Sequence, residues 1–191
     1  MPYITKDIAI SVNGQTWRVD SRKSGLMSHA IKVMINQVLA LLNHHSKVLI
    51  VRFDLHIYNQ TDDNEIITIF NRRLFKWLKR KYNLKRIGFI WCRELETAKR
   101  QHYHYVLMVN GHKVRHPIEI LLKIKEIWEQ HLNHSLEYTP KNCYYNLERG
   151  NFESIQGAIY RISYLAKARG KGYKPAQTKN YGTSRVKFNK K

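Results

Sequence analysis

The sequence predicts an α+β protein in which helices flank an antiparallel sheet of the split β-α-β (ferredoxin/RRM-like) type. From residue 47, the apolar patterns follow the order strand, helix, strand, strand, helix, strand, helix, and this order is typical of such a sheet. The chain has 191 residues, of which 43% are hydrophobic, so it can bury a sizeable core. We expect an N-terminal extension (1–46), a core domain (47–170) and a basic C-terminal tail (171–191).

The extension is expected to contain a hairpin and a helix that pack on the core. Strands are predicted over residues 3–12 and 16–19, because Asn13-Gly14 between them is a favourable hairpin turn. A helix is predicted over residues 26–42, where apolar residues recur at helical spacing.

The core is predicted to begin with a strand over residues 47–57. One face of this strand carries Arg52, Asp54 and His56, and the residues between them are apolar. A helix over residues 64–82 follows, and its outer faces are rich in Lys and Arg.

The second half of the core is predicted to begin with a β-hairpin. Two alternating segments, residues 86–95 and 101–109, are separated by a short polar stretch. Pro117 favours the first turn of a helix that ends near residue 131. The remaining predicted elements are a strand over residues 143–147, a helix over 152–168 that Gly170 closes, and a loop from Gly170 onward.

The net charge of +20 indicates a polyanionic partner. There are 34 Lys and Arg against 14 Asp and Glu, and nucleic acid is the commonest polyanion that such a surface attracts. No membrane partner is expected, because the charge is spread along the chain and no signal peptide, lipidation motif or spanning apolar run is present. Two cysteines build no disulfide framework, which indicates a reducing, cytoplasmic location.

His102-Tyr103-His104 is the first chemical motif. On the predicted strand over residues 101–109, His102 and His104 share one face. Two imidazoles at this spacing can share a divalent metal. The alternative is a pair of edge histidines that only form hydrogen bonds.

A carboxylate on the preceding strand supplies a third ligand. With a hairpin turn centred near residue 98, Glu94 lies almost opposite His102. Two imidazoles and a carboxylate leave positions for phosphate oxygens and water, which suits Mg²⁺ or Mn²⁺ in phosphoryl chemistry. Glu96 lies on the same face of the strand as Glu94 and is the alternative ligand. The other interpretation of both residues is that each is an ordinary solvated surface glutamate.

Tyr160, Tyr164 and Lys167 are spaced i, i+4 and i+7 on the last predicted helix, so they share one stripe. The apolar stripe of that helix is separate, so the two tyrosines are not needed for the core. A Tyr can be a covalent nucleophile, and a Lys can stabilise its phenolate or the phosphate charge. The alternative is that both rings pack at a helix–sheet boundary.

Further polar residues are candidates for contact with DNA. Arg52, Asp54 and His56 either line the floor of the same site or form an ordinary solvated face. In the tail, basic residues alternate with tyrosines, which suits single-stranded DNA because bases stack on Tyr while cations hold phosphates. The alternative is a tail that only aids solubility. The basic residues of the tail that we single out are Lys171, Lys174, Lys179 and Arg185.

These motifs together resemble those of the HUH endonucleases, which initiate rolling-circle replication, conjugation or single-strand transposition. The stretch from Arg93-Glu94-Leu95 to His102-Tyr103-His104 is similar to the second motif region of geminivirus replication initiators. Over about residues 47–186, the chain also resembles a family of inovirus and prophage replication-initiator-like proteins. The matching strings are Val51-Arg52-Phe53-Asp54-Leu55-His56, Trp91…Arg93-Glu94, His102-Tyr103-His104, Tyr160…Ser163-Tyr164-Leu165-Ala166-Lys167 and Thr178-Lys179…Tyr181-Gly182…Ser184-Arg185.

The resemblance implies the HUH endonuclease fold and metal-dependent nicking of single-stranded DNA or an origin hairpin. It makes His102, His104 and Glu94 the metal ligands, and Tyr164 with Tyr160 the candidate nucleophiles that form a 5′-phosphotyrosine adduct. Tyr164-Leu165-Ala166-Lys167 resembles the one-tyrosine pattern, because Ser163 stands where many two-tyrosine members carry a Lys. The matching strings also place Arg93 among the residues expected to contact DNA.

The expected setting is the cytoplasm of a bacterial host. No G-x-x-x-x-G-K-[ST] motif is present, so a host helicase is expected to unwind the DNA and a host polymerase to extend the free 3′-OH. The alternatives are a non-catalytic DNA-binding module or regulator with the same fold, and a packaging protein that uses charge alone.

Overall fold

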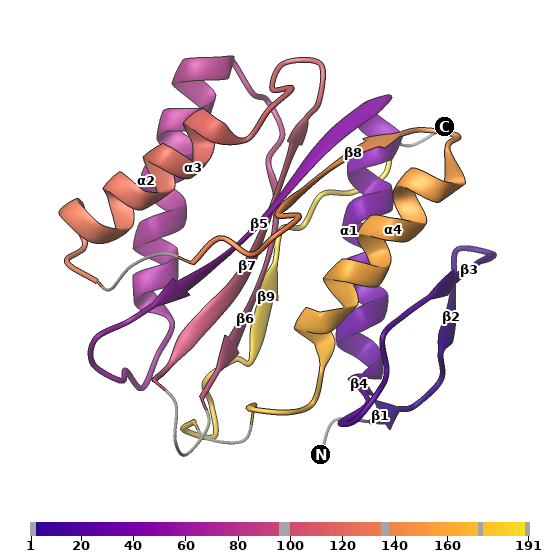
Figure 1. Ribbon diagram of the computed structural model, residues 1–191, viewed down its shortest axis with the longest axis horizontal. Helices are drawn as coiled ribbons and strands as arrows, with labels where there is room; N and C mark the ends of the chain where they lie inside the picture. Colours follow the sequence, from indigo (N-terminus) through magenta and orange to yellow (C-terminus); the bar gives the residue numbers. More distant parts are fainter. Residues whose placement is uncertain (1–2, 96–99, 135–137, 172–173, 190–191) are drawn as a thin grey trace.

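A five-stranded sheet forms the centre of the structure (Figure 1). Its strands lie in the order β8 (Tyr144–Glu148), β5 (Lys47–His56), β7 (His102–Asn110), β6 (Gly88–Glu94) and β9 (Tyr181–Thr183). Every neighbouring pair is antiparallel, which confirms the predicted α+β class. This computed structural model describes residues 3–95, 100–134, 138–171 and 174–189.

Helices cover both faces of the sheet (Figure 1). On one face lie α1 (Ser28–His44) and α4 (Phe152–Ile162), and on the other lie α2 (Glu65–Tyr82) and α3 (Ile118–Lys125). A short π-helix (Glu126–His131) continues α3. Among the described helices, none has the length and apolar character needed to cross a membrane.

The alternation of side chains along β5 lets one sheet serve two cores. Leu49 and Val51 belong to the core under α2 and α3, while Ile50 belongs to the core under α1 and α4. Successive side chains of a strand point to opposite faces, so Arg52 and Asp54 follow Ile50 on the same face. Both are buried. The face covered by α1 and α4 therefore changes from apolar to polar along the strand.

The predicted N-terminal hairpin is present as β2 (Ala9–Val12) and β3 (Gln15–Arg18). Asn13 and Gly14 have φ angles of 52° and 76°, which is the left-handed backbone that a two-residue type I′ turn requires. Trp17 of β3 is fully buried and stacks on Phe152 of α4, with ring centroids 5.3 Å apart. The hairpin is thus packed against the core by an aromatic contact.

The predicted strand over residues 3–12 is interrupted. Its first part is β1 (Ile4–Thr5), which pairs with β4 (Leu26–Met27) in a second small sheet. This pairing also explains why α1 begins at Ser28 rather than at residue 26. The domain boundaries at residues 46 and 170 stay a prediction.

Two predictions for the C-terminal part are wrong. The helix predicted over residues 152–168 ends at Ile162 and is followed by a 3₁₀ turn (Ser163–Ala166). The tail was predicted to be a loop, but Tyr181–Thr183 form the edge strand β9 on β6. A Cβ atom at Gly182 would lie 2.6 Å from the Trp91 ring, so this strand approaches β6 where glycine leaves room.

Candidate metal centre

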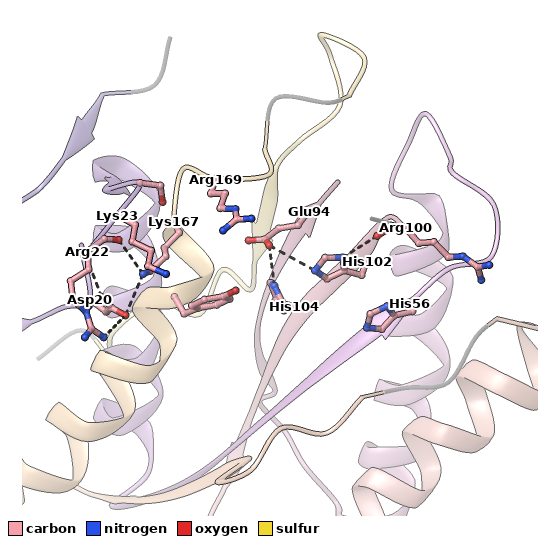
Figure 2. Close-up of a pocket in the computed structure, with 12 residues that line it drawn as sticks. Asp20, Arg22, Lys23, His56, Glu94, Arg100, His102, His104, Lys167 and Arg169 are labelled. Atoms are coloured by element: carbon pink, nitrogen blue, oxygen red, sulfur yellow. Dashed lines mark hydrogen bonds and ion pairs between the residues drawn. The ribbon is translucent and has the colours of Figure 1, made fainter. Parts of the chain in front are cut away.

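Three metal-ligating side chains meet at one end of the sheet (Figure 2). Glu94 ends β6, and His102 and His104 begin β7. Glu94 pairs directly with His102 across the two strands, as the hairpin prediction requires. One ligand atom from each residue can be chosen so that all three lie within 4.8 Å of one another.

Hydrogen bonds fix the orientation of both imidazoles. His102 Nδ1 lies 3.1 Å from the carbonyl oxygen of Arg100, and His104 Nδ1 lies 2.8 Å from Asp54 Oδ1. Since these oxygens are acceptors, each Nδ1 carries the proton and donates it. The Nε2 atoms of His102 and His104 then face Glu94 Oε2, at 3.8 Å and 3.1 Å.

The electrostatics of the cluster favour an ionised carboxylate. Burial opposes the charge on Glu94, but hydrogen bonding from His104 and the charge of Lys171 outweigh it and lower the pKa of Glu94 to about 2. Burial also opposes the charge on His104, yet hydrogen bonds to Asp54 and Glu94 raise the pKa of His104 above its ordinary value. A buried carboxylate therefore faces two imidazole nitrogens.

This donor set fits a divalent cation. Two imidazole nitrogens and one carboxylate oxygen form a mixed N/O site, and the second nitrogen of each ring is already held by a hydrogen bond. The Nε2 of His104 lies 3.1 Å from Glu94 Oε2. A divalent cation bound between them would neutralise this carboxylate and take the place of any proton on that nitrogen. Glu94, His102 and His104 could thus hold a divalent metal, and the cluster is compatible with an HUH motif.

The three polar residues predicted on one face of β5 lie beside this cluster. Asp54 pairs with His104 across β5 and β7, and His56 pairs with His102. The rings of His56 and His102 are stacked, with centroids 5.1 Å apart. Arg52 Nη2 lies 3.6 Å from Asp54 Oδ1, so this buried carboxylate has a charged neighbour as well as an imidazole.

Tyr164 lies at the edge of the same cluster. Its ring centroid is 5.2 Å from that of His104, and the Arg52 guanidinium lies 5.1 Å from the Tyr164 centroid. Lys167 Nζ is 5.7 Å from that centroid. Burial and the nearby charge of Glu94 raise the pKa of Tyr164, so the phenol is protonated at neutral pH.

Only part of the predicted stripe of Tyr160, Tyr164 and Lys167 lies at the pocket: Tyr164 and Lys167 line it together, and Tyr160 does not. A 3₁₀ turn has 3.0 residues per turn instead of 3.6, so the change after Ile162 rotates Tyr164 away from the direction of Tyr160. Tyr164 lines the pocket around the three candidate ligands, whereas Tyr160 is exposed on α4 and does not line it.

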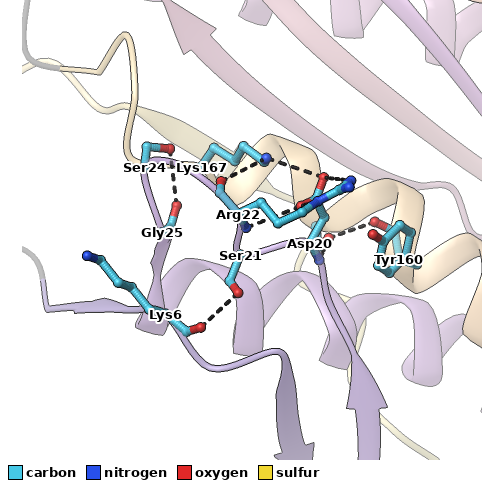
Figure 3. Close-up of polar contacts among 9 residues, drawn as sticks. Lys6, Asp20, Ser21, Arg22, Ser24, Gly25, Tyr160 and Lys167 are labelled. Carbon is cyan, nitrogen blue, oxygen red and sulfur yellow. Dashed lines mark hydrogen bonds and ion pairs between the residues drawn. The ribbon is translucent and has the colours of Figure 1, made fainter.

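The pocket has a volume of about 820 Å³, and the N-terminal segment forms one wall. Lys167 Nζ lies 3.3 Å from Asp20 Oδ2 and donates to the carbonyl oxygen of Arg22 (Figure 3). The backbone N–H of Asp20 donates to Ser163 Oγ. Sequence reasoning missed this wall, because no local pattern joins residues 20–24 to residues 163–167. The pocket is lined by Asp20, Arg22, Lys23, Ser24, His56, Glu94, Arg100, His102, His104, Tyr164, Lys167 and Arg169.

Arg93 does not face the pocket, which contradicts its predicted contact with DNA. It is adjacent to Glu94 in β6 and therefore points to the opposite face of the sheet. Its side chain is 2% exposed and donates to the carbonyl oxygens of Thr61 and Asp63 and to Gln101 Oε1. Arg93 thus fastens the loop before α2 instead of facing the pocket.

Lys171 is also placed differently from the prediction. Its side chain is 3% exposed, and Nζ lies 2.6 Å from Glu94 Oε1, so it neutralises the candidate metal ligand and is not available as a surface contact for DNA. Lys174 is half-buried, while Lys179 and Arg185 are exposed, and DNA binding by these three stays a prediction. Glu96, the alternative ligand, lies outside the described residues.

Comparison with known protein families gives a match. The family model of the YagK/YfjJ C-terminal domain matches residues 13–184, which is most of the chain. No curated protein and no solved structure matches.

Proposed function

Since the chain belongs to the YagK/YfjJ C-terminal domain family, which is associated with prophages, we propose that it is an HUH-type endonuclease. In this proposal the protein nicks single-stranded DNA at a replication origin and remains joined to the 5′ end of the cut strand. Its metal ligands are Glu94, His102 and His104, and its nucleophile is Tyr164. The reaction initiates rolling-circle replication of a phage, plasmid or other mobile element.

The position of Tyr164 is the observation that supports this function. Its ring lies 5.2 Å from that of His104, at the edge of the pocket that the three ligand residues line. A nucleophile and a metal centre that share one open pocket can act on the same phosphate. Tyr160 does not line this pocket, so the proposal assigns one nucleophile.

The cut is a transesterification. Tyr164 Oη loses its proton and forms a bond to phosphorus, and the P–O3′ bond of the DNA breaks. The 3′ oxygen takes up a proton and becomes the free 3′-OH, while the 5′ phosphate stays on the tyrosine. The number of phosphoester bonds is unchanged, so the adduct can later rejoin DNA ends without ATP.

The residues around Tyr164 suit this chemistry. A Mg²⁺ or Mn²⁺ ion held by the three ligands would polarise the scissile phosphate. Arg52 and Lys167 lie against the Tyr164 ring, and their positive charges favour the phenolate and the developing phosphate charge. Arg22, Lys23 and Arg100 also line the pocket and would bind the phosphates on either side of the cut.

One observation favours a second candidate, a non-catalytic DNA-binding module or regulator. Lys171 and His104 already satisfy both carboxylate oxygens of Glu94, at 2.6 Å and 3.1 Å. A site that is electrostatically balanced in this way needs no ion for its stability. The second candidate retains the fold and the basic surface, and lacks the reaction.

Formation of the adduct tests the first candidate. The full chain is incubated with Mn²⁺ and a pool of single-stranded oligonucleotides of randomised sequence that carry a 3′ label. Denaturing electrophoresis is then expected to show labelled protein, because the 5′ phosphate of the labelled fragment is attached to Tyr164. EDTA should abolish this band.

Two tyrosine variants form the matched pair. Tyr164→Phe is expected to lose the labelled band, and Tyr160→Phe to retain it. A band that depends on Tyr160 instead would show that the nucleophile is misassigned. If no band forms although the oligonucleotides bind, and His102→Ala binds them equally well, the endonuclease proposal is wrong and the second candidate is favoured.

A further inference from the structure

A second concave basic surface lies at the other end of the sheet. It is a groove of about 610 Å³ formed by the end of α2, the start of β6 and the C-terminal tail. We call it the tail groove. Its basic residues are Lys79, Lys85, Arg86, Arg185 and Lys187, and its aromatic residues are Phe75, Phe89 and Phe188.

The tail groove is separate from the metal-centre pocket. The two have no lining residue in common. Phe89 and Glu94 are both on β6, five residues apart, which corresponds to about 17 Å along a strand. A nucleotide bound in the tail groove is therefore too far from Glu94 and Tyr164 to contact them as well.

The tail segment that borders the groove is held by specific polar contacts. Ser184 N donates to Phe89 O, and Ser184 Oγ and Val186 N both donate to the buried Gln37 Oε1 of α1. His44 Nε2 lies 2.8 Å from the carbonyl oxygen of Lys187. These contacts use main-chain atoms of the tail and the Ser184 hydroxyl, and they leave the side chains of Arg185 and Lys187 exposed at the groove.

The charges of the tail groove are uncompensated within the described part of the chain. No Asp or Glu lines the groove. None of its five Lys and Arg residues belongs to an ion pair between described residues. Five like charges around one concave surface attract an anionic ligand.

The aromatic residues narrow the class of ligand. The rings of Phe75 and Phe89 are 5.5 Å apart and partly exposed, and Phe188 is 44% exposed. Phosphates on Lys and Arg together with bases on aromatic rings are the two contacts that bind single-stranded nucleic acid. A duplex keeps its bases stacked inside the helix, and an acidic peptide would leave the phenylalanines without a partner.

We propose that the tail groove is a second binding site for single-stranded DNA. It binds a segment of the strand at a distance from the metal centre, with phosphates on Arg185 and Lys187 and a base on Phe188. The choice of DNA rests on the proposed function, but binding in the groove requires neither metal nor cleavage. Two separate contacts on one strand raise the local concentration of DNA at each site.

Binding of a labelled strand tests the proposal. Fluorescence anisotropy is measured with fluorescein-labelled oligothymidylate and the full chain in EDTA, so that no cleavage occurs. Arg185→Glu/Lys187→Glu is compared with Lys32→Glu/Lys125→Glu, which makes the same change in net charge at exposed positions outside the groove. The groove variant is expected to bind at least about tenfold more weakly than this control.

The dependence on salt and on Phe188 gives two further readouts. Loss of two phosphate contacts should reduce the slope of log K against log salt concentration by about 1.4, because each phosphate on a single strand contributes about 0.7. Phe188→Ala retains all charges and is expected to weaken binding about fivefold or more through loss of stacking. Circular dichroism checks the fold, and Arg185→Gln/Lys187→Gln replaces the glutamate pair if that variant is unfolded.

Three results would overturn the proposal. The groove variant could bind as tightly as the Lys32/Lys125 control, or Phe188→Ala could bind as tightly as the native chain. Polyglutamate could also displace the oligonucleotide as effectively, per charge, as unlabelled oligothymidylate does. If the groove variants bind normally and the Tyr164 adduct still forms, only this inference fails and the proposed endonuclease stands.

Discussion

His104 and Asp54 are hydrogen-bonded across β7 and β5, with Nδ1 and Oδ1 2.8 Å apart. This contact assigns the proton to Nδ1 and leaves Nε2 directed toward Glu94. It also joins two parts of the sequence that are 50 residues apart. The orientation of one candidate ligand is therefore decided by a residue that is not itself a ligand.

Replacement of Asp54 is expected to weaken metal binding without removing a ligand. A carboxylate behind a ligating histidine orients the ring and raises its basicity, and its loss typically costs about 10- to 100-fold in affinity. Asp54→Ala should therefore bind Mn²⁺ more weakly by about this factor, and Asp54→Asn, which can still accept the hydrogen bond, by less. Isothermal titration calorimetry measures both.

The exposed Asp62 provides the matched control. Asp62→Asn changes the net charge by the same amount as Asp54→Asn and is expected to retain the native affinity. Equal affinities for Asp54→Ala and the native protein would mean that Asp54 does not orient His104.

Lys171→Met is expected to make the protein more dependent on metal. The variant leaves the buried Glu94 without the ammonium group 2.6 Å away, and removal of one partner of a buried pair costs about 3 kcal/mol. The free energy of unfolding in EDTA should fall by about this amount, and added Mn²⁺ should raise the Tm by more than it does for the native chain. Lys174→Met, at a half-buried position, should behave as the native chain does. A smaller Mn²⁺-induced shift in Lys171→Met would contradict this account of the ion pair.

The stability of the metal-free protein is expected to depend on pH through His104. Burial opposes its charge, but Asp54 and Glu94 raise its pKa in the folded state above the ordinary 6.5. A group with a raised folded pKa stabilises the protein fully below its unfolded pKa, and this contribution disappears as the pH rises through the folded value.

The stabilisation by His104 should therefore be largest below about pH 6.5 and decrease as the solution becomes more alkaline. Urea denaturation in EDTA, from pH 5.5 to 9, measures it as the difference in unfolding free energy between the native chain and His104→Gln. A difference that grows with rising pH would show that the charged form of His104 is not the stabilised one.

Two glycine-to-alanine substitutions should change stability in opposite directions. At Gly182 an added Cβ would lie 2.6 Å from the Trp91 ring, and overpacking of this kind costs about 1–3 kcal/mol. At Gly157, on the exposed side of α4, the nearest side-chain atom is 4.0 Å away, and Ala in a helix is favoured over Gly by about 0.5–1 kcal/mol. Urea denaturation of both variants checks the signs. If Gly182→Ala were as stable as the native chain, β9 would not be fixed against β6 in the way described.

Much of the fold was predictable because local patterns carried it. The order of elements from β5 to α4 follows from residue periodicity, and the hairpin of β6 and β7 sets Glu94 opposite His102 by register alone. The strand β9 was not predictable, since three residues of a Gly- and Tyr-containing tail have no periodicity and pair only because an edge of β6 is available.

The environment of the site was less predictable than its ligands. The burial of Arg93 on the opposite face follows from strand parity and was available from the sequence, whereas the burial of Lys171 against Glu94 depends on the path of the chain after α4. Tyr160 and Tyr164 separate because the helix changes to a 3₁₀ turn, which the i, i+4 spacing does not reveal. The wall around Asp20 needs contacts across more than 140 residues.

The sequence by itself determined the sheet with its flanking helices, the net positive charge and the alignment of Glu94 with His102. These features depend on periodicity, composition and the register of one hairpin, all of which are local in the chain. Only the tertiary structure decided which tyrosine lies at the ligands, which lysine neutralises Glu94 and which carboxylate orients His104. Those relationships join residues that are distant in sequence, and they exist only after the sheet has been assembled and its helices have packed.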